Sequence, residues 1–235
     1  MGLVSTTPLR GLLVDWGGVL TIPLDGAMAR WAQADGVDFD QFRAILRDWS
    51  HLDDAAVAGP GADPLVHRLE RGELHTVEFE QALADELGRR GTPVAAQGLL
   101  GRILGDLDGL EDDMIHLVRR ARAAGIRTAL LSNSWGDHYP DALWDNLFDA
   151  VVISGRVGMR KPEPAIFAHT AALLGLSPPE CVMVDDLARN VHAAVAAGMV
   201  AVHHHDYEAT AHELEVLFEV PLRHVPAAPE PGEVL

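Results

Sequence analysis

Five short apolar runs alternate with segments of helical apolar spacing, and this alternation constrains the fold of the 235-residue chain. Each run suits a buried strand, and apolar residues three and four positions apart predict helices between the runs. Strands that alternate with helices form right-handed crossovers and a parallel sheet covered by helices on both faces. The predicted strands are 11–16, 126–132, 150–154, 181–185 and 199–203, and the predicted helices among them are 114–124, 164–174 and 189–197.

Residues 22–108 have a different pattern, with several helical segments and no convincing strand. The predicted helices there are 27–34, 39–50, 63–71, 76–90 and 94–104. We therefore expect an α/β core of residues 1–21 and 109–220 that is interrupted after its first strand by a helical insert. The stretch 221–235 is rich in proline and acidic residues, and we expect it to be a flexible tail.

The acidic composition argues against nucleic acid as a partner. Asp and Glu number 35 against 18 Lys and Arg, which gives a formal net charge of −17. This charge repels phosphate backbones, and no basic patch stands out in the sequence. The one cysteine, Cys181, lies in an apolar run and is expected to be buried. Because no apolar run approaches 18 residues and no signal-peptide pattern is present, we expect a cytoplasmic protein without a membrane partner.

Two polar motifs follow the first two predicted strands. Asp15 ends the first strand and is followed by Gly17 and Gly18, which let a ligand approach the backbone. An acid in this position can serve as a nucleophile or as a metal ligand. Ser132 and Asn133 end the second strand and can donate hydrogen bonds to phosphate oxygens, although a serine there also suits a helix N-cap.

Two further motifs carry charge. Lys161, the only lysine of the chain, precedes prolines that stiffen the backbone before a predicted helix. Asp185 and Asp186 end the fourth strand, and adjacent buried acids require a compensating cation, for which hard oxygen ligands favour Mg²⁺. Because ligands bind at the carboxyl ends of parallel strands, we expect Asp15, Ser132 and Asp185 to share one site.

In chain order, these motifs resemble those of the haloacid dehalogenase superfamily. The four are Asp-x-x-Gly-Val-Leu, Leu-Ser-Asn, Lys-Pro-Glu-Pro-x-Ile-Phe and Val-Asp-Asp-x-x-x-Asn-Val. The resemblance extends from residue 11 to about residue 204, and the last two motifs are the most specific. It implies a Rossmann-like parallel five-stranded sheet with helices, and the insert resembles the helical cap of the first type. Within the superfamily, the chain most resembles sugar-phosphate phosphatases and the N-terminal phosphatase domain of soluble epoxide hydrolases.

The resemblance implies a Mg²⁺-dependent phosphatase that acts, as a monomer or homodimer, on a small phosphorylated metabolite such as a sugar phosphate. Asp15 would attack phosphorus and form an aspartyl-phosphate, while Lys161 would stabilise the developing charge. The other implied roles are phosphate binding by Ser132, Asn133 and Lys161, and Mg²⁺ binding by Asp15, the carbonyl of Gly17, Asp185 and Asp186.

One position departs from the pattern of the superfamily. Most of its phosphatases carry a general acid, a second aspartate, two residues after the nucleophile, where this chain has Gly17. General acid–base catalysis contributes a factor of about 10²–10⁴. Three consequences are possible. The enzyme favours good leaving groups such as an anomeric phosphate, or the substrate or a cap residue such as Asp25 donates the proton to the leaving group, or turnover is slow.

Alternative functions remain open at this point. A non-catalytic or regulatory protein of the same fold is the main alternative, favoured by Gly17 and opposed by the retained Asp15, Lys161 and acidic pair. A haloacid dehalogenase is a weaker alternative, because that branch lacks the acidic pair. A phosphonoacetaldehyde hydrolase would need a cap lysine, which the chain does not have, and a phosphomutase would need the missing aspartate.

The histidine run and the aromatic residues after the second motif are interpreted as structural rather than as ligand-binding residues. The run His203–Asp206 suggests zinc, but neighbouring strand residues point to opposite faces, so we expect only a strand end and a loop. Trp135 and His138 follow the second motif, and we expect them to pack beneath the cap rather than to line the mouth of the site.

Overall fold

The computed structural model describes residues 7–50, 63–105, 109–136, 139, 144 and 146–223. Its centre is a five-stranded, all-parallel sheet with the strand order β3-β2-β1-β4-β5. The strands are β1 (Gly11–Val14), β2 (Arg127–Ser132), β3 (Ala150–Ile153), β4 (Cys181–Asp185) and β5 (Val200–His203). The predicted fold class and all five predicted strands are confirmed.

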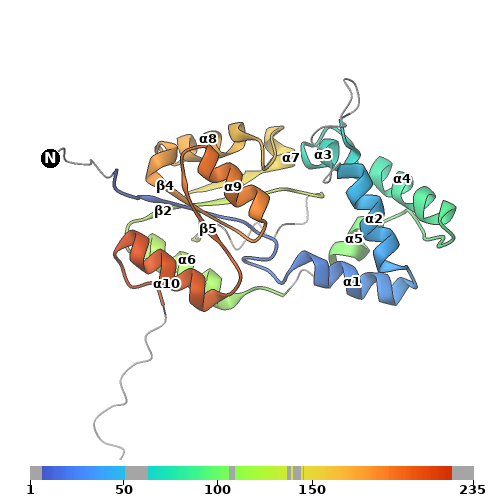
Figure 1. The fold of residues 1–235 in the computed structure, drawn as a ribbon, viewed down its shortest axis with the longest axis horizontal. Coiled ribbons are helices and arrows are strands. Elements are labelled where there is room, and N and C mark those ends of the chain that lie inside the picture. Colours follow the sequence, from blue (N-terminus) through green and yellow to red (C-terminus); the bar gives the residue numbers. More distant parts are fainter. Residues whose placement is uncertain are drawn as a thin grey trace, which may run out of the picture.

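Helices cover both faces of this sheet (Figure 1). One layer holds α6 (Asp112–Ala123) and α10 (Tyr207–Phe218), and the other holds α8 (Pro164–Leu173) and α9 (Ala188–Ala196). Successive strand residues point to opposite faces, so Leu12 of β1 packs in the α6 and α10 layer, while Leu13 packs in the α8 and α9 layer. The middle residues of the strands are therefore mostly apolar, as a sheet buried on both faces requires.

The chain between β1 and α6 forms a helical insert with its own hydrophobic core, on the right in Figure 1. Amphipathic helices bury their apolar faces against one another there, around residues such as Trp31, Phe42 and Phe79. The insert begins with α1 and α2, from which residues of the site described below project. Its helices are α1 (Leu24–Asp35), α2 (Phe39–Ser50), α3 (Leu65–Glu70), α4 (Thr76–Arg89) and α5 (Leu99–Leu104).

The remaining elements include a short helix, α7 (Ser154–Val157), and a 3₁₀ turn, η3 (Pro178–Glu180). Helix α10 follows the histidine run and was not predicted, and the Asp206 side chain caps it by accepting a hydrogen bond from the Ala209 amide at 2.9 Å.

The chain after α10 continues to pack on the core. Leu222, inside the expected tail, is fully buried, and residues from 224 onward lie outside the described part of the chain. Within the described ranges, no helix is long and apolar enough to cross a membrane.

Candidate active site

Polar residues at the ends of three neighbouring strands meet at one edge of the sheet. Asp15 follows β1, which lies between β2, ending at Ser132, and β4, ending at Asp185. The parallel register places Val14 beside Val184, and the Asp15 amide donates to the Val184 carbonyl at 3.0 Å. The predicted meeting of these three residues follows directly from this register.

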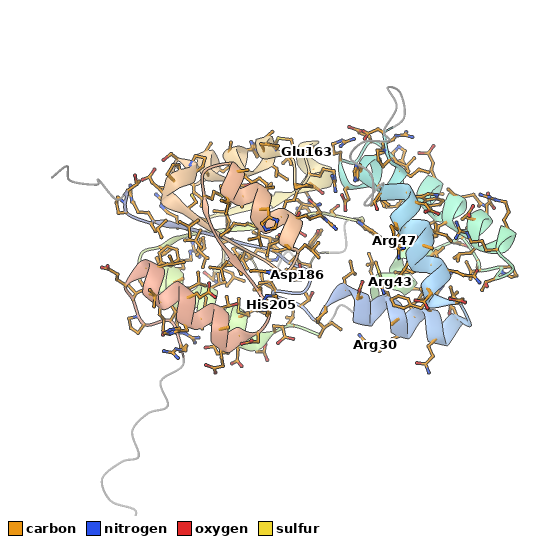
Figure 2. All side chains as sticks on the ribbon, viewed as in Figure 1. Arg30, Arg43, Arg47, Glu163, Asp186 and His205 are labelled. Atoms are coloured by element: carbon orange, nitrogen blue, oxygen red, sulfur yellow. The ribbon has the colours of Figure 1, made fainter. Side chains whose placement is uncertain are left out.

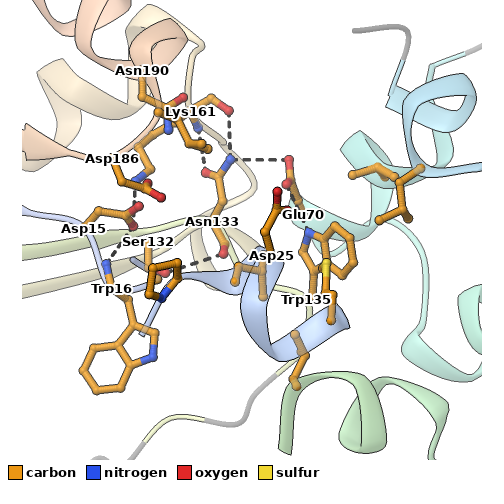
Figure 3. Close-up of a pocket in the computed structure, with 18 of the residues that line it drawn as sticks. Asp15, Trp16, Asp25, Glu70, Ser132, Asn133, Trp135, Lys161, Asp186 and Asn190 are labelled. Atoms are coloured by element: carbon orange, nitrogen blue, oxygen red, sulfur yellow. Dashed lines mark hydrogen bonds and ion pairs between the residues drawn. The ribbon is translucent and has the colours of Figure 1, made fainter. Parts of the chain in front are cut away.

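Lys161 is buried between the carboxylates of Asp15 and Asp185, and Figure 3 shows it beside Asp15. Its Nζ lies 2.7 Å from Oδ1 of Asp15 and 2.6 Å from Oδ2 of Asp185, and the residue is 1% exposed. Burial by itself would lower the pKa of this ammonium, but the attraction of the two carboxylates outweighs burial and raises the pKa above its ordinary value. The only lysine of the chain is therefore a permanently charged part of the site.

The Asn133 amide holds the backbone of Lys161 in place. Its Nδ2 donates to the Lys161 carbonyl at 2.9 Å, and its Oδ1 accepts from the Lys161 amide at 2.8 Å. Nδ2 also lies 3.4 Å from Oε2 of Glu70 in the insert. The amide predicted to bind phosphate is thus engaged in positioning the lysine backbone.

Three carboxylates gather where a metal ion could bind. Single oxygens of Asp15, Asp185 and Asp186 lie within 4.8 Å of one another. Burial, opposed by Lys161 and reinforced by Asp185 and Asp186, raises the pKa of Asp15 to about 7. Burial and the neighbouring Asp185 likewise raise the pKa of Asp186 to about 6. The single positive charge of Lys161 does not compensate the negative charge of three carboxylates, so a hard divalent cation such as Mg²⁺ fits the donor set.

The two members of the acidic pair occupy different positions. Asp185 is fully buried, and its Oδ1 accepts from the Leu187 amide and from Nδ2 of Asn190, both at 2.9 Å. Asp186 faces the adjoining cavity. Asp185 thus anchors Lys161 from within, whereas Asp186 is the member of the pair that a ligand can reach.

The histidine run does not form a second cluster of ligands. His203 Nε2 bonds to the Asp186 carbonyl at 2.9 Å, and His204 Nδ1 bonds to Thr210 Oγ1 at 2.8 Å. Among the described residues, the aspartate cluster is the only group of three or more His, Cys, Asp or Glu placed to share a metal ion.

The two glycines after the nucleophile differ in their surroundings. Gly18 has φ +75°, and a Cβ on it would collide with the Asp186 carboxylate, so only glycine fits there. A Cβ on Gly17 would meet no heavy atom within 4 Å, and the backbone of Gly17 lies outside the left-handed region. The position of the missing acid therefore has room for a side chain.

A cavity of about 950 Å³ opens beside these residues and is walled by both core and insert. On the core side, the Tyr139 hydroxyl lies 2.9 Å from Ser132 Oγ, and its ring packs edge-on to Trp16 at 6.0 Å. Burial raises the pKa of Tyr139 to about 12, so its hydroxyl stays neutral and able to donate. Nothing in the sequence had pointed to this tyrosine, which lies in the loop after Ser132.

Trp135 both lines the cavity and packs against the insert, so the two alternatives considered for it are not exclusive. Its ring centroid lies 5.9 Å from that of Phe79 in the insert. His138 lies outside the described residues. Cys181 is buried in the core as expected, and burial raises the pKa of its thiol to about 11. Asp25, the candidate proton source in the insert, lines the cavity.

Glu70, the last residue of α3, joins the insert to the core. Its carboxylate pairs with Arg160 Nε and accepts from Trp135 Nε1 at 3.2 Å and from Asn133 Nδ2 at 3.4 Å. Its backbone carbonyl accepts from Ser154 Oγ. Both side chains of the Glu70–Arg160 ion pair are only 7% exposed, so neither can regain water if the other is lost.

Glu70→Gln is expected to lower the free energy of unfolding by about 3 kcal/mol, because it leaves Arg160 buried without a counter-charge. Glu73→Gln is the matched control, since Glu73 pairs with Arg71 at a 48% exposed side chain and should contribute less than about 1 kcal/mol. Urea denaturation of both variants measures the difference. Equal losses would contradict a structural role for the buried pair.

The fold and this site define a doubly covered α/β protein with an acidic nucleophile candidate and a bridging lysine at the carboxyl edge of a parallel sheet. The family model described as haloacid dehalogenase-like hydrolase matches residues 9–198. The chain therefore belongs to the haloacid dehalogenase-like hydrolase family, as the motifs had indicated.

Individual relatives agree with this assignment. Sesquiterpene phosphatase astK of Aspergillus oryzae is 28% identical over 74% of this chain and 91% of its own length. Bifunctional epoxide hydrolase 2 of Sus scrofa is 26% identical over 94% of this chain, but the chain spans only 41% of that protein. The chain likewise spans only 19% of Acyl-CoA dehydrogenase family member 10 of Mus musculus, to which it is 28% identical.

Among solved structures, the fold is similar to that of a HAD family enzyme from Bacteroides thetaiotaomicron. The TM-score is 0.63, the identity is 20%, and the match covers 88% of this chain and 99% of the other. That enzyme has also been crystallised with magnesium and inorganic phosphate.

Proposed function

We propose that this protein is a Mg²⁺-dependent phosphatase that hydrolyses a small phosphorylated metabolite, with Asp15 as the nucleophile. The observation that carries the proposal is the buried Lys161 between Asp15 and Asp185, with Asp186 facing the cavity beside them. Burying such a cluster of charges costs free energy, and clusters of this kind are concentrated at functional sites. Phosphoryl transfer uses such charges, since its catalysis is mainly positioning and charge neutralisation.

The donor set supports Mg²⁺ as the cofactor. We propose Asp15, Asp186 and the carbonyl of Gly17 as ligands, with Asp185 as a more distant or water-mediated one. When bound, the ion neutralises charge on the phosphoryl group and favours the ionised form of the carboxylates. The match to a phosphatase, Sesquiterpene phosphatase astK, over 91% of that protein's length supports the same reaction class.

The hydrogen bonds of Asp15 indicate which of its oxygens reacts. Both Lys161 Nζ and the Trp16 amide lie 2.7 Å from Oδ1, and no described residue donates to Oδ2. In the proposed reaction, Oδ2 attacks phosphorus while the bond from phosphorus to the alcohol oxygen breaks. The alcohol leaves with a proton, and water then cleaves the aspartyl-phosphate to release phosphate and restore the carboxylate.

The other residues of the site bind and neutralise the phosphoryl group. We assign phosphate binding to Ser132 and to the Lys161 ammonium, which stays charged throughout. Asn133 holds the lysine backbone and acts on the phosphate through it. The neutral Tyr139 hydroxyl, 2.9 Å from Ser132 Oγ, adds a donor at the same end of the cavity. These donors are preorganised, which is where most of such rate enhancement arises.

The helical insert is proposed to be the cap of the enzyme. The described parts of residues 22–108 carry their own hydrophobic core and supply one wall of the cavity, while those of residues 1–21 and 109–220 supply the reacting groups. An insert in this position can exclude water during the reaction and open for exchange of substrate and product.

Phosphate release from p-nitrophenyl phosphate and a panel of sugar phosphates tests the proposal, with Mg²⁺ or EDTA present. We expect release that needs Mg²⁺ and that disappears in Asp15→Asn, which keeps the shape of the side chain but not its charge. Asp113→Asn is the matched control, since Asp113 is an exposed carboxylate of α6 that does not line the cavity. Folded protein that releases no phosphate from any substrate would overturn the proposal in favour of a dehalogenase or a non-catalytic member of the family.

A further inference from the structure

The wall of the cavity formed by the insert carries two arginines of one helix. Arg43 and Arg47 both line the cavity and are one helical turn apart on α2 (Figure 2). Side chains four positions apart on a helix lie side by side, about 5–6 Å apart at their Cβ atoms. Both residues are exposed toward solvent rather than packed into the core of the insert.

Arg43 contacts an aromatic ring rather than a carboxylate. Several other arginines of the insert pair with carboxylates, for example Arg71 with Glu73 at 2.9 Å and Arg102 with Asp35 at 3.4 Å. No carboxylate in the described part of the chain lies within ion-pair distance of Arg43, whose guanidinium carbon lies 5.7 Å from the centre of the Phe39 ring. A cation that has no counter-ion among the described residues of a protein of net charge −17 is well placed to receive an anionic ligand.

Much of the cavity wall that the insert supplies is apolar. Apolar side chains of the insert and its linkers face the cavity there: Leu24, Met28, Leu46, Val66 and Leu104. Such a wall favours a substrate with an apolar carbon skeleton over one with many hydroxyl groups. Guanidinium groups, in turn, bind carboxylates and phosphates in bidentate fashion. The cavity therefore combines the charged reaction site of the core with two arginines and apolar surface of the insert.

We propose that Arg43 and Arg47 form a second anion-binding subsite, and that the substrate is a phosphomonoester with a second anionic group beyond an apolar carbon skeleton. The second group is a phosphate or a carboxylate, both of which fit a guanidinium pair. This inference rests on the proposed phosphatase function, for which the reacting phosphate lies at Asp15.

Competitive inhibition of p-nitrophenyl phosphate hydrolysis tests the subsite without depending on the leaving group. The probes are alkylphosphonates, α,ω-alkyl bisphosphonates and ω-phosphonocarboxylates, each from butyl to octyl. We expect the best doubly anionic probe to inhibit about tenfold more strongly than the alkylphosphonate of equal length. Comparison of the bisphosphonate and carboxylate series identifies the second group.

Substitutions then locate the subsite. We expect the preference for doubly anionic probes to fall about tenfold in Arg43→Gln and in Arg47→Gln. Arg30→Gln is the matched control, because Arg30 is an arginine of α1 that does not line the cavity, and the preference should survive there. The proposed subsite would be refuted if doubly anionic probes showed no preference at any chain length, or if the preference survived both substitutions on α2. Neither result would affect the proposed phosphatase function.

Absence of p-nitrophenyl phosphate hydrolysis would instead count against the phosphatase. In that case, calorimetric dissociation constants of the same probes replace the inhibition constants. A preference that depends on Arg43 and Arg47 would still support the subsite, and no dependence would still refute it.

Discussion

Lys161→Met is expected to lower kcat/KM for phosphate release by a factor of at least about 10²–10³, the usual loss when one preorganised stabiliser of developing charge is removed. Methionine is similar in length and apolar, so it fills the buried space without the ammonium that lies 2.7 Å from Asp15 and 2.6 Å from Asp185. Lys161→Arg keeps the charge, but a planar guanidinium cannot place one nitrogen between the two carboxylates, so we expect partial activity.

The same substitution should change how stability depends on pH in the metal-free protein. The pKa of Asp15 is raised from 3.8 to about 7 by burial and by the other carboxylates, against the opposing effect of Lys161. Between these two pH values, the folded state binds a proton that the unfolded state has lost. The free energy of unfolding therefore falls, by a few kcal/mol, as pH rises from about 4 to about 7.

Loss of Lys161 removes the contact that holds the pKa of Asp15 down, so the pKa should rise further. The decline in stability of Lys161→Met should then continue above pH 7, where that of the wild type levels off. Urea denaturation in EDTA across this range measures both curves, and Mg²⁺ should flatten the wild-type curve by replacing the bound proton. Identical pH curves, or more than a tenth of wild-type activity in Lys161→Met, would contradict the role given to this lysine.

The parts of the site that depend on strand ends could be predicted from the sequence. Asp15, Ser132 and Asp185 each follow an apolar run, and a parallel sheet brings the carboxyl ends of its strands to one edge. The ends of β4 and α2 were predicted to the residue, since an acidic pair and a change in apolar spacing mark them. Helix α5 begins at Leu99, five residues after its predicted start at 94, because Gly98 adopts φ +68° and separates it from the preceding turn.

The contacts between insert and core could not be predicted. Glu70 lies in a segment without a motif, and its partner Arg160, which directly precedes the Lys161 motif, is 90 positions away in the sequence. Their placement depends on how two separately packed cores meet, which apolar periodicity does not encode. The second motif illustrates the same limit, because nothing in the sequence indicated that the side-chain amide of Asn133 bonds to the Lys161 backbone.

Gly17→Asp is expected to raise kcat for alkyl phosphate esters by a factor of about 10²–10⁴, the usual contribution of a general acid. The structure permits this substitution, because a Cβ at Gly17 meets no heavy atom within 4 Å and the backbone is not left-handed. The new carboxyl would lie at the cavity, two residues from Asp15, where the leaving oxygen requires a proton. Hydrolysis of p-nitrophenyl phosphate should change little, because its leaving group departs without one.

Two variants separate proton donation from other effects of the new side chain. Gly17→Asn has the same shape without the acid and should give no comparable gain. Gly18→Asp, by contrast, would place its Cβ against the Asp186 carboxylate in a left-handed conformation, and should lose activity and stability together. The measurement is kcat for a series of esters whose alcohols span a range of pKa, with each variant saturated with Mg²⁺.

The slope of log kcat against the pKa of the leaving alcohol shows whether proton donation to the leaving group limits turnover. A steep slope in the wild type that becomes shallow in Gly17→Asp would mean that proton donation limits turnover, and that this enzyme selects substrates with good leaving groups. A slope that is already shallow in the wild type would contradict that account. It would mean that a resident group supplies the proton, and Asp25→Asn and Tyr139→Phe, which alter two proton donors facing the cavity, would then identify which one.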